Sequence, residues 1–228
     1  VAGGADGQVL AVVNGTPEWM PLPSFGPRAL SVYNAGTGAV ASLDGDGSYL
    51  AGALTLTTTG GAPTRTQAWW NTATVANAGT SAGSLKRGLF TRYMDRFKFA
   101  VNALSDGTDT YVLEIGLGRI TSTVNPPVDG VFIRISGATV EAVMRSGDTE
   151  TASAGAMSAT AATVMEALID YTPGVGASMY LDGVLIATVA SNEPGSTVAM
   201  HVFARHHRTA GTAVTRTTEI ADRRVWLF

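Results

Sequence analysis

Short apolar stretches that alternate every second residue with other side chains are the feature that most constrains this chain. In residues 97–101, 131–135 and 140–144, every other side chain is Phe, Val, Ile, Ala or Met. A period of two residues is typical of strands that place one face on a core. No window of a dozen residues has the helical period of about 3.6 residues. A helical turn is an alternative only within residues 159–170, where the alternation over 163–170 favours a strand.

Turn residues separate these stretches at regular intervals. Asp182-Gly183 lies between two apolar runs, which is the signature of a tight hairpin with a type I′ turn. A second hairpin is expected over residues 130–145, turning at 136–139. Further strands are expected near 29–34, 48–58, 65–70, 89–101, 110–119, 197–205 and 214–228. About a dozen strands without helices predict an all-β chain folded as two packed antiparallel sheets, a β-sandwich.

The N-terminal segment differs from the rest in its density of turn residues and prolines. We expect residues 1–27 to form an extended shaft or linker, and residues 28–228 to form the β-sandwich domain. The chain begins at Val1 rather than Met, which favours a fragment or processed piece of a longer protein.

Two stretches of this segment resemble a repeat of phage tail fibres. Residues 4–10 read GADGQVL and residues 14–19 read NGTPEW, similar to the Gly-x-Asp-Gly-Gln-Val-Leu and Gly-x-Pro-x-Trp repeat of virion appendages. The resemblance implies the receptor-binding end of a tail fibre or spike, located on the virion and extracellular. Its few apolar residues favour burial against copies of itself in a homotrimer, or against the next domain. An ordinary flexible lead-in is the alternative.

A second resemblance covers residues from about 60 to 228. The hairpin at 178–186 (SMYLDGVLI), followed by 221–226 (ADRRVW), resembles the late strands of concanavalin-A-like, or laminin-G-like, jelly-roll domains. This resemblance implies a jelly-roll sandwich and a lectin-like binding role.

Composition and charge exclude several classes of function. The net charge of −3 and the absence of a basic stripe argue against a nucleic-acid partner. No stretch approaches eighteen apolar residues, so membrane insertion is not expected. Without Cys, disulfides and thiolate metal sites are excluded, and no cofactor is expected.

Motifs that suggest chemistry fail their context tests. Residues 79–83 match the Gly-x-Ser-x-Gly elbow, but no helix is expected after them. The histidines at 201, 206 and 207 lack an acidic neighbour in sequence, so no metal site is predicted. The acidic turns at 44–47 and 106–109 do not complete a calcium loop, because Thr55 occupies the twelfth position of the first. A structural calcium stays an alternative.

Carboxylates are too scattered to predict an enzyme. Sandwich glycanases place several acidic residues along one strand. Here Glu114 stands alone in its strand, and Glu219 and Asp222 are three residues apart. We therefore predict a binding module, with carboxylates assembled from distant strands as the enzymatic alternative.

Aromatic and basic residues supply the predicted ligand-binding set. Sugar rings stack on exposed aromatic side chains, which makes Trp69, Trp70, Tyr93 and Tyr111 candidates, with burial or a subunit interface as the alternative. A second group is expected in an exposed loop or strand end as a contact for an anionic glycan: Arg205, His206, His207 and Arg208.

These observations favour a host-receptor-binding module of a phage tail fibre or spike. The expected partner is a bacterial surface polysaccharide or outer-membrane receptor. Three alternatives stay open: a glycan-depolymerising tailspike domain, a cellular lectin-like module, and a decoration of the virion head or neck.

Overall fold

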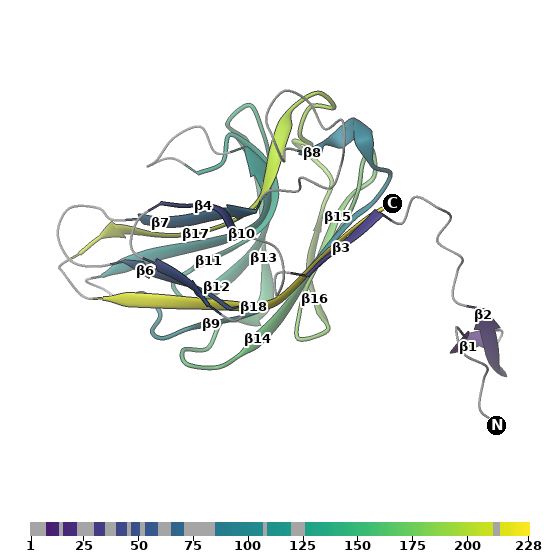
Figure 1. The fold of residues 1–228 in the computed structure, drawn as a ribbon, viewed down its shortest axis with the longest axis horizontal. Helices are drawn as coiled ribbons and strands as arrows, with labels where there is room; N and C mark the ends of the chain where they lie inside the picture. The colour runs from purple at the N-terminus through teal and green to yellow at the C-terminus, as the bar shows by residue number, and fades with distance from the viewer. Residues whose placement is uncertain are drawn as a thin grey trace.

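Two antiparallel sheets face each other in the computed structural model of this chain, with β7, β17 and β10 above β6, β18 and β9 in Figure 1. The structure describes residues 8–13, 16–21, 30–34, 40–44, 47–50, 53–58, 65–70, 85–106, 109–119, 126–211 and 215–228. Its side-chain description covers 54–57, 85–106, 109–119, 126–153, 157–211 and 215–228. Within these ranges every regular element is a strand except a 3-10 turn at Arg87–Leu89. The predicted antiparallel β-sandwich is confirmed.

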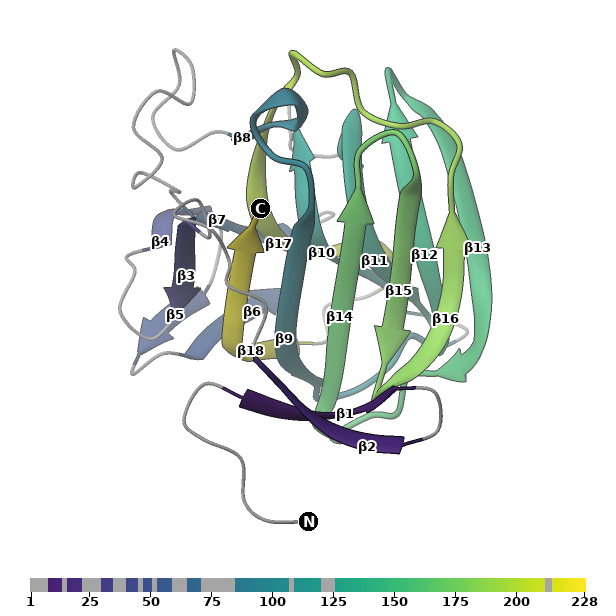
Figure 2. The same ribbon diagram turned by 90° about the vertical axis from the view of Figure 1, so that its right-hand side faces the viewer.

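Each sheet is named here after one of its inner strands. The β10 sheet contains, in spatial order, β13 (Thr149–Ser158), β12 (Thr139–Ser146), β11 (Asp129–Ser136), β10 (Thr110–Arg119), β17 (Ala199–Ala210), β7 (Arg65–Trp70) and β4 (Val40–Asp44), and β8 (Leu85–Lys86) also pairs with β17. The β9 sheet contains β16 (Val184–Val189), β15 (Gly176–Leu181), β14 (Met165–Thr172), β9 (Tyr93–Val101), β18 (Arg216–Leu227), β6 (Ala53–Thr58) and β5 (Gly47–Leu50), and β3 (Leu30–Asn34) also pairs with β18. Figure 2 shows β18, β9, β14, β15 and β16 of the β9 sheet side by side, with β16 next to β13 at one edge.

A small hairpin precedes the sandwich where an extended linker was expected. Strands β1 (Gln8–Val13) and β2 (Thr16–Pro21) are antiparallel partners and form a separate two-stranded sheet. The expected shaft or linker covered residues 1–27, and within this range the two strands pair with each other. The predicted boundary at residue 27 lies outside the described residues.

Local turn chemistry sets the observed hairpins. Asp182 and Gly183 have φ angles of 49° and 77° between β15 and β16, as a type I′ turn requires, which confirms this hairpin. The predicted hairpin of β11 and β12 also forms, with Gly137 at φ 62° in its turn. A third turn, at Gly147 and Asp148, adds β13, which the sequence reading missed.

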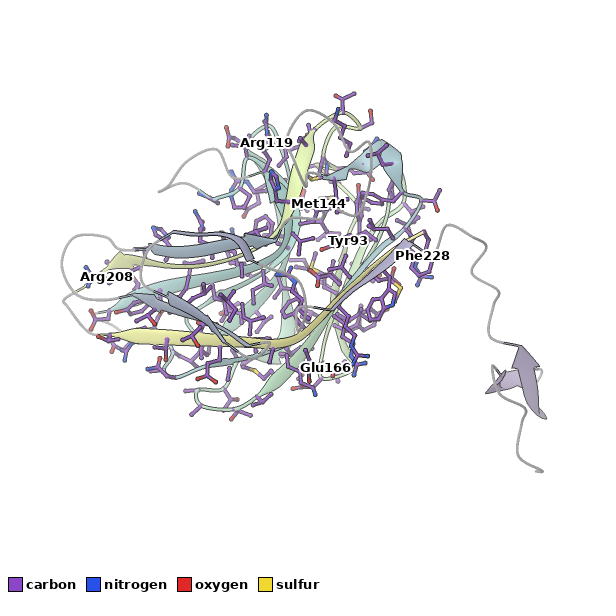
Figure 3. The ribbon with its side chains drawn as sticks, viewed as in Figure 1. Tyr93, Arg119, Met144, Glu166, Arg208 and Phe228 are labelled. Atoms are coloured by element: carbon purple, nitrogen blue, oxygen red, sulfur yellow. The ribbon has the colours of Figure 1, made fainter. Side chains whose placement is uncertain are left out.

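Alternating burial places the core between the sheets. In β14 each second residue from Met165 is buried, and β9 repeats the pattern from Tyr93. Figure 3 shows Tyr93 and Met144 between the two layers, whereas Glu166 lies on the outer side of the β9 sheet. The sequence period thus translates directly into the two faces of each sheet.

A buried ion pair lies in this core. Arg223 of β18 donates from Nε to Asp95 Oδ1 on β9 at 3.0 Å, and both side chains are fully buried. The same guanidinium donates to the Phe203 carbonyl at 2.9 Å and to the Gly116 carbonyl at 3.1 Å. Because these two carbonyls belong to the β10 sheet, one side chain joins the two layers by hydrogen bonds.

Tyr93 completes this core cluster. Its hydroxyl donates to Asp95 Oδ2 at 2.8 Å. Burial raises the pKa of Tyr93 well above its ordinary value, and the charge of Asp95 adds to this shift. The phenol is therefore neutral and acts as a donor. Tyr93, Asp95 and Arg223 thus satisfy one another's hydrogen-bonding groups in the interior, as buried polar groups must.

Candidate functional site: a polar groove on the outer face of the β10 sheet

A groove of about 480 Å³ lies on the outer face of the β10 sheet. Four inner and neighbouring strands supply most of its lining: β17, β10, β11 and β12. Its lining residues are Val112, Glu114, Pro126, Arg134, Ser136, Thr139, Glu141, Arg205, His207 and Thr209. Guanidinium, carboxylate, hydroxyl and imidazole groups line the groove together with apolar atoms of residues such as Val112 and Pro126.

Strand register explains why these residues meet. Glu114 faces Arg205 across the β10–β17 pair and Arg134 across the β10–β11 pair. Arg134 in turn faces Glu141 across the β11–β12 pair. Directly opposed residues share one face of a sheet, so a single row of alternating charge runs over four strands. We call Arg205, Glu114, Arg134 and Glu141 the charge row.

Ion pairs hold the charge row in place. Arg205 Nε donates to Glu114 Oε2 at 2.9 Å, and each side chain is only 2 % exposed. Arg134 Nε donates to Glu141 Oε2 at 2.7 Å, with side chains 17 % and 22 % exposed. The row thus has a buried half, which forms the groove floor, and a half that solvent reaches.

Glu150 on β13 extends the row by a bidentate contact. Arg134 donates from Nη1 and Nη2 to Glu150 at 2.9 Å and 2.7 Å, and Arg145 Nη1 also donates to Glu150 at 2.9 Å. Paired forks of this kind fix the guanidinium plane. Arg134 is therefore oriented by carboxylates on two sides.

The pKa shifts follow from burial and pairing. Burial raises the pKa of Glu114 and outweighs the opposing effect of Arg205. Burial also works against the charge of Arg134, but its hydrogen bonds with Glu150 and Glu141 raise the pKa of the guanidinium overall. For Glu150, burial raises the pKa, but the hydrogen bond and charge of Arg134 lower it further, so the net pKa shift is downward. Arg134 and Glu150 are therefore ionised at neutral pH.

An apolar cluster lies beside the charge row, two residues away along each of the four strands. Phe203, Gly116, Phe132 and Val143 oppose one another across the same four strands. The two phenyl rings meet edge to face with centroids 5.8 Å apart. Gly116 has no side chain, which leaves room for this ring contact between its neighbours.

The basic cluster of β17 is not the exposed loop or strand end that was predicted. Arg205, His206 and Arg208 are buried, and His207 is half-buried. They lie inside β17, which has β10 on one side and β7 on the other, with Arg208 near one end of the molecule in Figure 3. Arg205 and His207 line the groove, whereas His206 and Arg208 alternate to the opposite face.

His206 packs against the interior rather than the groove. Its Nδ1 lies 3.4 Å from Thr218 Oγ1, and its ring centroid lies 5.5 Å from that of Tyr111. Burial lowers the pKa of His206 to about 4, and the charges of His207 and Arg216 add to this effect. The native imidazole is neutral.

This lowered pKa predicts a pH dependence of stability. Between the unfolded pKa of about 6.5 and the folded pKa of about 4, the unfolded chain binds more protons, so stability falls as the pH is lowered. We expect a loss of about 2 kcal/mol between pH 6.5 and pH 5, measured by urea unfolding. A His206→Gln variant should lose less stability over this interval, and equal slopes for both proteins would contradict the assignment.

Of the four aromatic residues predicted to contact a glycan, two are buried and two have side chains outside the described residues. Tyr93 is 0 % exposed and belongs to the core cluster with Asp95, so it offers no face to a sugar. Tyr111 is also buried, with its ring 5.3 Å from the Arg216 guanidinium. Both lie at positions of their strands that face the core, where the two-residue period places large apolar rings. Trp69 and Trp70 are backbone partners of Phe203 and Val202, but their side chains lie outside the described residues.

Three residues of the charge row were not among the predicted binding residues: Glu114, Arg134 and Glu141. Glu114 carried a usable signal, because a carboxylate between Leu113 and Ile115 in an apolar strand must face away from the core or be paired. Arg134 and Glu141 show no such signal, since their meeting depends on hairpin register.

Other chemical sites are not evident in the described part of the chain. The described residues contain no group of three or more His, Cys, Asp or Glu side chains placed to hold a metal ion. Nor does any helix within them combine the length and apolar character needed to cross a membrane. The elbow-like residues 79–83 and residues 45–46 of the acidic turn at 44–47 lie outside the described residues.

The fold is a jelly-roll β-sandwich, and the groove lies on the outer face of its β10 sheet. Residues 55–221 match the protein family described as SO2946-like, C-terminal domain, and this chain belongs to that family. No curated protein matches the chain.

Solved structures similar to this chain share its fold at low sequence identity. The Emp47p carbohydrate recognition domain has a TM-score of 0.55 at 12 % identity, covering 82 % of this chain and 87 % of that one. The potassium-bound Emp46p carbohydrate recognition domain has a TM-score of 0.55 at 11 % identity, covering 81 % and 87 %. A botulinum neurotoxin type C structure, described by its interaction with two ganglioside molecules, has a TM-score of 0.53 at 13 % identity. That match covers 97 % of this chain but 48 % of the neurotoxin chain, so this chain spans about half its length.

Proposed function

We propose that this chain is a carbohydrate-binding module and that the groove on the β10 sheet is its glycan site. The observation that carries the proposal is the charge row, in which planar donors and acceptors are fixed by ion pairs along an open groove. Sugar hydroxyls are recognised by a few positioned polar groups of this kind. Carbohydrate recognition domains and a ganglioside-dependent toxin among the similar structures support the same class of ligand.

We further propose that the module attaches a virion to its host, as the tip of a phage tail fibre or spike. The support is the resemblance of residues 4–19 to tail-fibre repeats, together with a β-hairpin at β1 and β2 too small to bury its own apolar residues. The proposal includes a homotrimer, a bacterial surface glycan as receptor and an extracellular location on the virion. Light scattering tests the trimer, and immunogold labelling of virions tests the location. A monomer at all concentrations would contradict the first, and unlabelled tails the second.

Binding without hydrolysis is the activity we propose for the groove. Both of its lining carboxylates, Glu114 and Glu141, are engaged by guanidinium groups. A general acid must hold and release a proton next to the glycosidic oxygen, which a buried and ion-paired carboxylate such as Glu114 is poorly placed to do. Incubation with a bound polysaccharide should release no reducing ends, whereas release would support a depolymerase.

Replacing Arg134 with Gln is expected to weaken glycan binding at least tenfold. The substitution removes charged donors at the solvent-reached half of the groove, and one hydrogen bond to a charged group contributes about 1.5–3 kcal/mol. Calorimetric titration with the strongest ligand from a glycan array measures the change.

Arg96→Gln is the matched control for this variant. Arg96 pairs with Glu166 at 2.7 Å, the same Nη2-to-carboxylate distance as between Arg134 and Glu150, but on the outer face of the β9 sheet. Its affinity should equal that of the unmodified chain. Equal losses in both variants would place binding elsewhere, and a thermal melt of each confirms folding.

A further inference from the structure

The groove retains unused hydrogen-bonding capacity of both signs. A guanidinium has five N–H donors. The three Arg134 nitrogens each donate one hydrogen bond within the protein, to Glu141 or Glu150, which leaves two N–H groups. Among the described residues, Glu141 accepts from Arg134 through Oε2, and its Oε1 has no protein donor. A donor pair and an acceptor thus lie together where solvent reaches the row.

The charges that line the groove cancel. Two arginines and two glutamates alternate along the row, and each arginine has a carboxylate directly opposite it in register. Of the remaining basic residues of the β17 cluster, Arg208 and His206 occupy the opposite face and only His207 lines the groove. The excess of positive charge suggested by the sequence is absent from the groove.

An anionic sugar is disfavoured by this arrangement. A carboxylate or sulfate placed against Arg134 would lie beside Glu141, and one placed against Arg205 would lie beside Glu114. Like charges at such distances repel, and they do so more strongly in a partly desolvated groove than in water. A hydroxyl group meets no such conflict, because it accepts from the guanidinium and donates to the carboxylate at the same time.

We propose that the groove selects uncharged, polyhydroxylated sugar units over acidic ones. This inference rests on the proposed carbohydrate-binding function and names its ligand class. A neighbouring pair of hydroxyls on a neutral hexose fits the donor pair of Arg134 and the open oxygen of Glu141. The hydroxyls of Ser136, Thr139 and Thr209 lie on the same lining and add neutral partners.

The test is an array of bacterial O-antigen and capsule oligosaccharides in two matched sets, one neutral and one bearing uronic or sialic acid. The 228-residue chain is applied at 50 mM and at 500 mM NaCl. We expect binding to neutral members, with less than a threefold change between the two salt concentrations. Glu141→Gln should lose about tenfold in affinity for the neutral ligand and gain affinity for acidic members. Glu166→Gln, on the opposite sheet, is the control and should match the unmodified chain.

The outcomes separate the inference from the function on which it rests. Preferential binding to acidic members, abolished by Arg134→Gln and weakened by salt, would overturn the neutral selectivity while supporting a glycan site in this groove. Binding that neither groove variant changes would overturn the placement of the site. Absence of binding to both sets, with the chain folded by circular dichroism, would overturn the carbohydrate-binding function itself.

Discussion

Replacing Asp95 with Ala is expected to lower the free energy of unfolding by about 3–5 kcal/mol. The substitution leaves the Arg223 guanidinium in the core without its carboxylate, at a position where both side chains are 0 % exposed. It also removes the acceptor of the Tyr93 hydroxyl. The hydrogen bonds from Arg223 to Phe203 and Gly116 carbonyls cannot neutralise the charge. Urea unfolding monitored by circular dichroism measures the loss.

Two comparisons isolate the effect of burial. Asp222→Ala removes the partner of Lys98 at 2.8 Å on the surface, where water screens the ion pair and the loss of stability should be much smaller. The double variant Asp95→Leu, Arg223→Met removes both buried charges and should recover most of the stability lost by Asp95→Ala. If Asp95→Ala cost no more than Asp222→Ala, the buried pair would not stabilise the fold.

Gly116→Ala is expected to destabilise the chain by about 3 kcal/mol, at the upper end of the usual cost of overpacking. A Cβ atom at Gly116 would lie 2.4 Å from the Val131 carbonyl oxygen and 2.7 Å from the Phe132 Cα. Both are backbone atoms of β11, so β10 and β11 would have to move apart. Because Glu114 and Arg134 face each other on these two strands, glycan binding should fall as well.

Gly137→Ala is the control for this substitution. Gly137 lies in a hairpin turn at φ 62°, and a Cβ there would meet no atom within 4 Å. Only the left-handed backbone is then unfavourable, at a cost of about 1–2 kcal/mol. Equal losses of stability for the two variants, with glycan affinity unchanged in both, would show that close approach at Gly116 does not matter. Chemical denaturation and titration of each variant provide the two measurements.

Local signals were sufficient for the hairpins. Asp182-Gly183 selects its turn through backbone preferences of two residues, so no information about distant strands is needed. Strand β13 was not predicted, because residues 149–158 are mostly Thr, Ser, Ala and Gly. Such a strand has no apolar alternation to read, and it forms because β12 offers it a pairing edge.

The site depends on pairings that no local pattern encodes. Arg205 meets Glu114 across 91 residues of sequence, and Arg223 meets Asp95 across 128. A cluster of Arg and His in sequence is divided between two faces by its strand, so its exposure cannot be read from polarity alone. For the same reason Tyr93 and Tyr111 were candidates for glycan contact, although both lie at positions of their strands that face the core.

The last two strands have a consequence for how this chain is made. β17 pairs with β10, β7 and β8, and β18 pairs with β9, β6 and β3. Strands from the N-terminal third therefore pair with strands that are synthesised much later. Vectorial synthesis at roughly 5–20 residues per second leaves their edges unpaired for about 10 seconds. The emergence of β17 and β18, rather than of any earlier hairpin, should set the moment at which both sheets close.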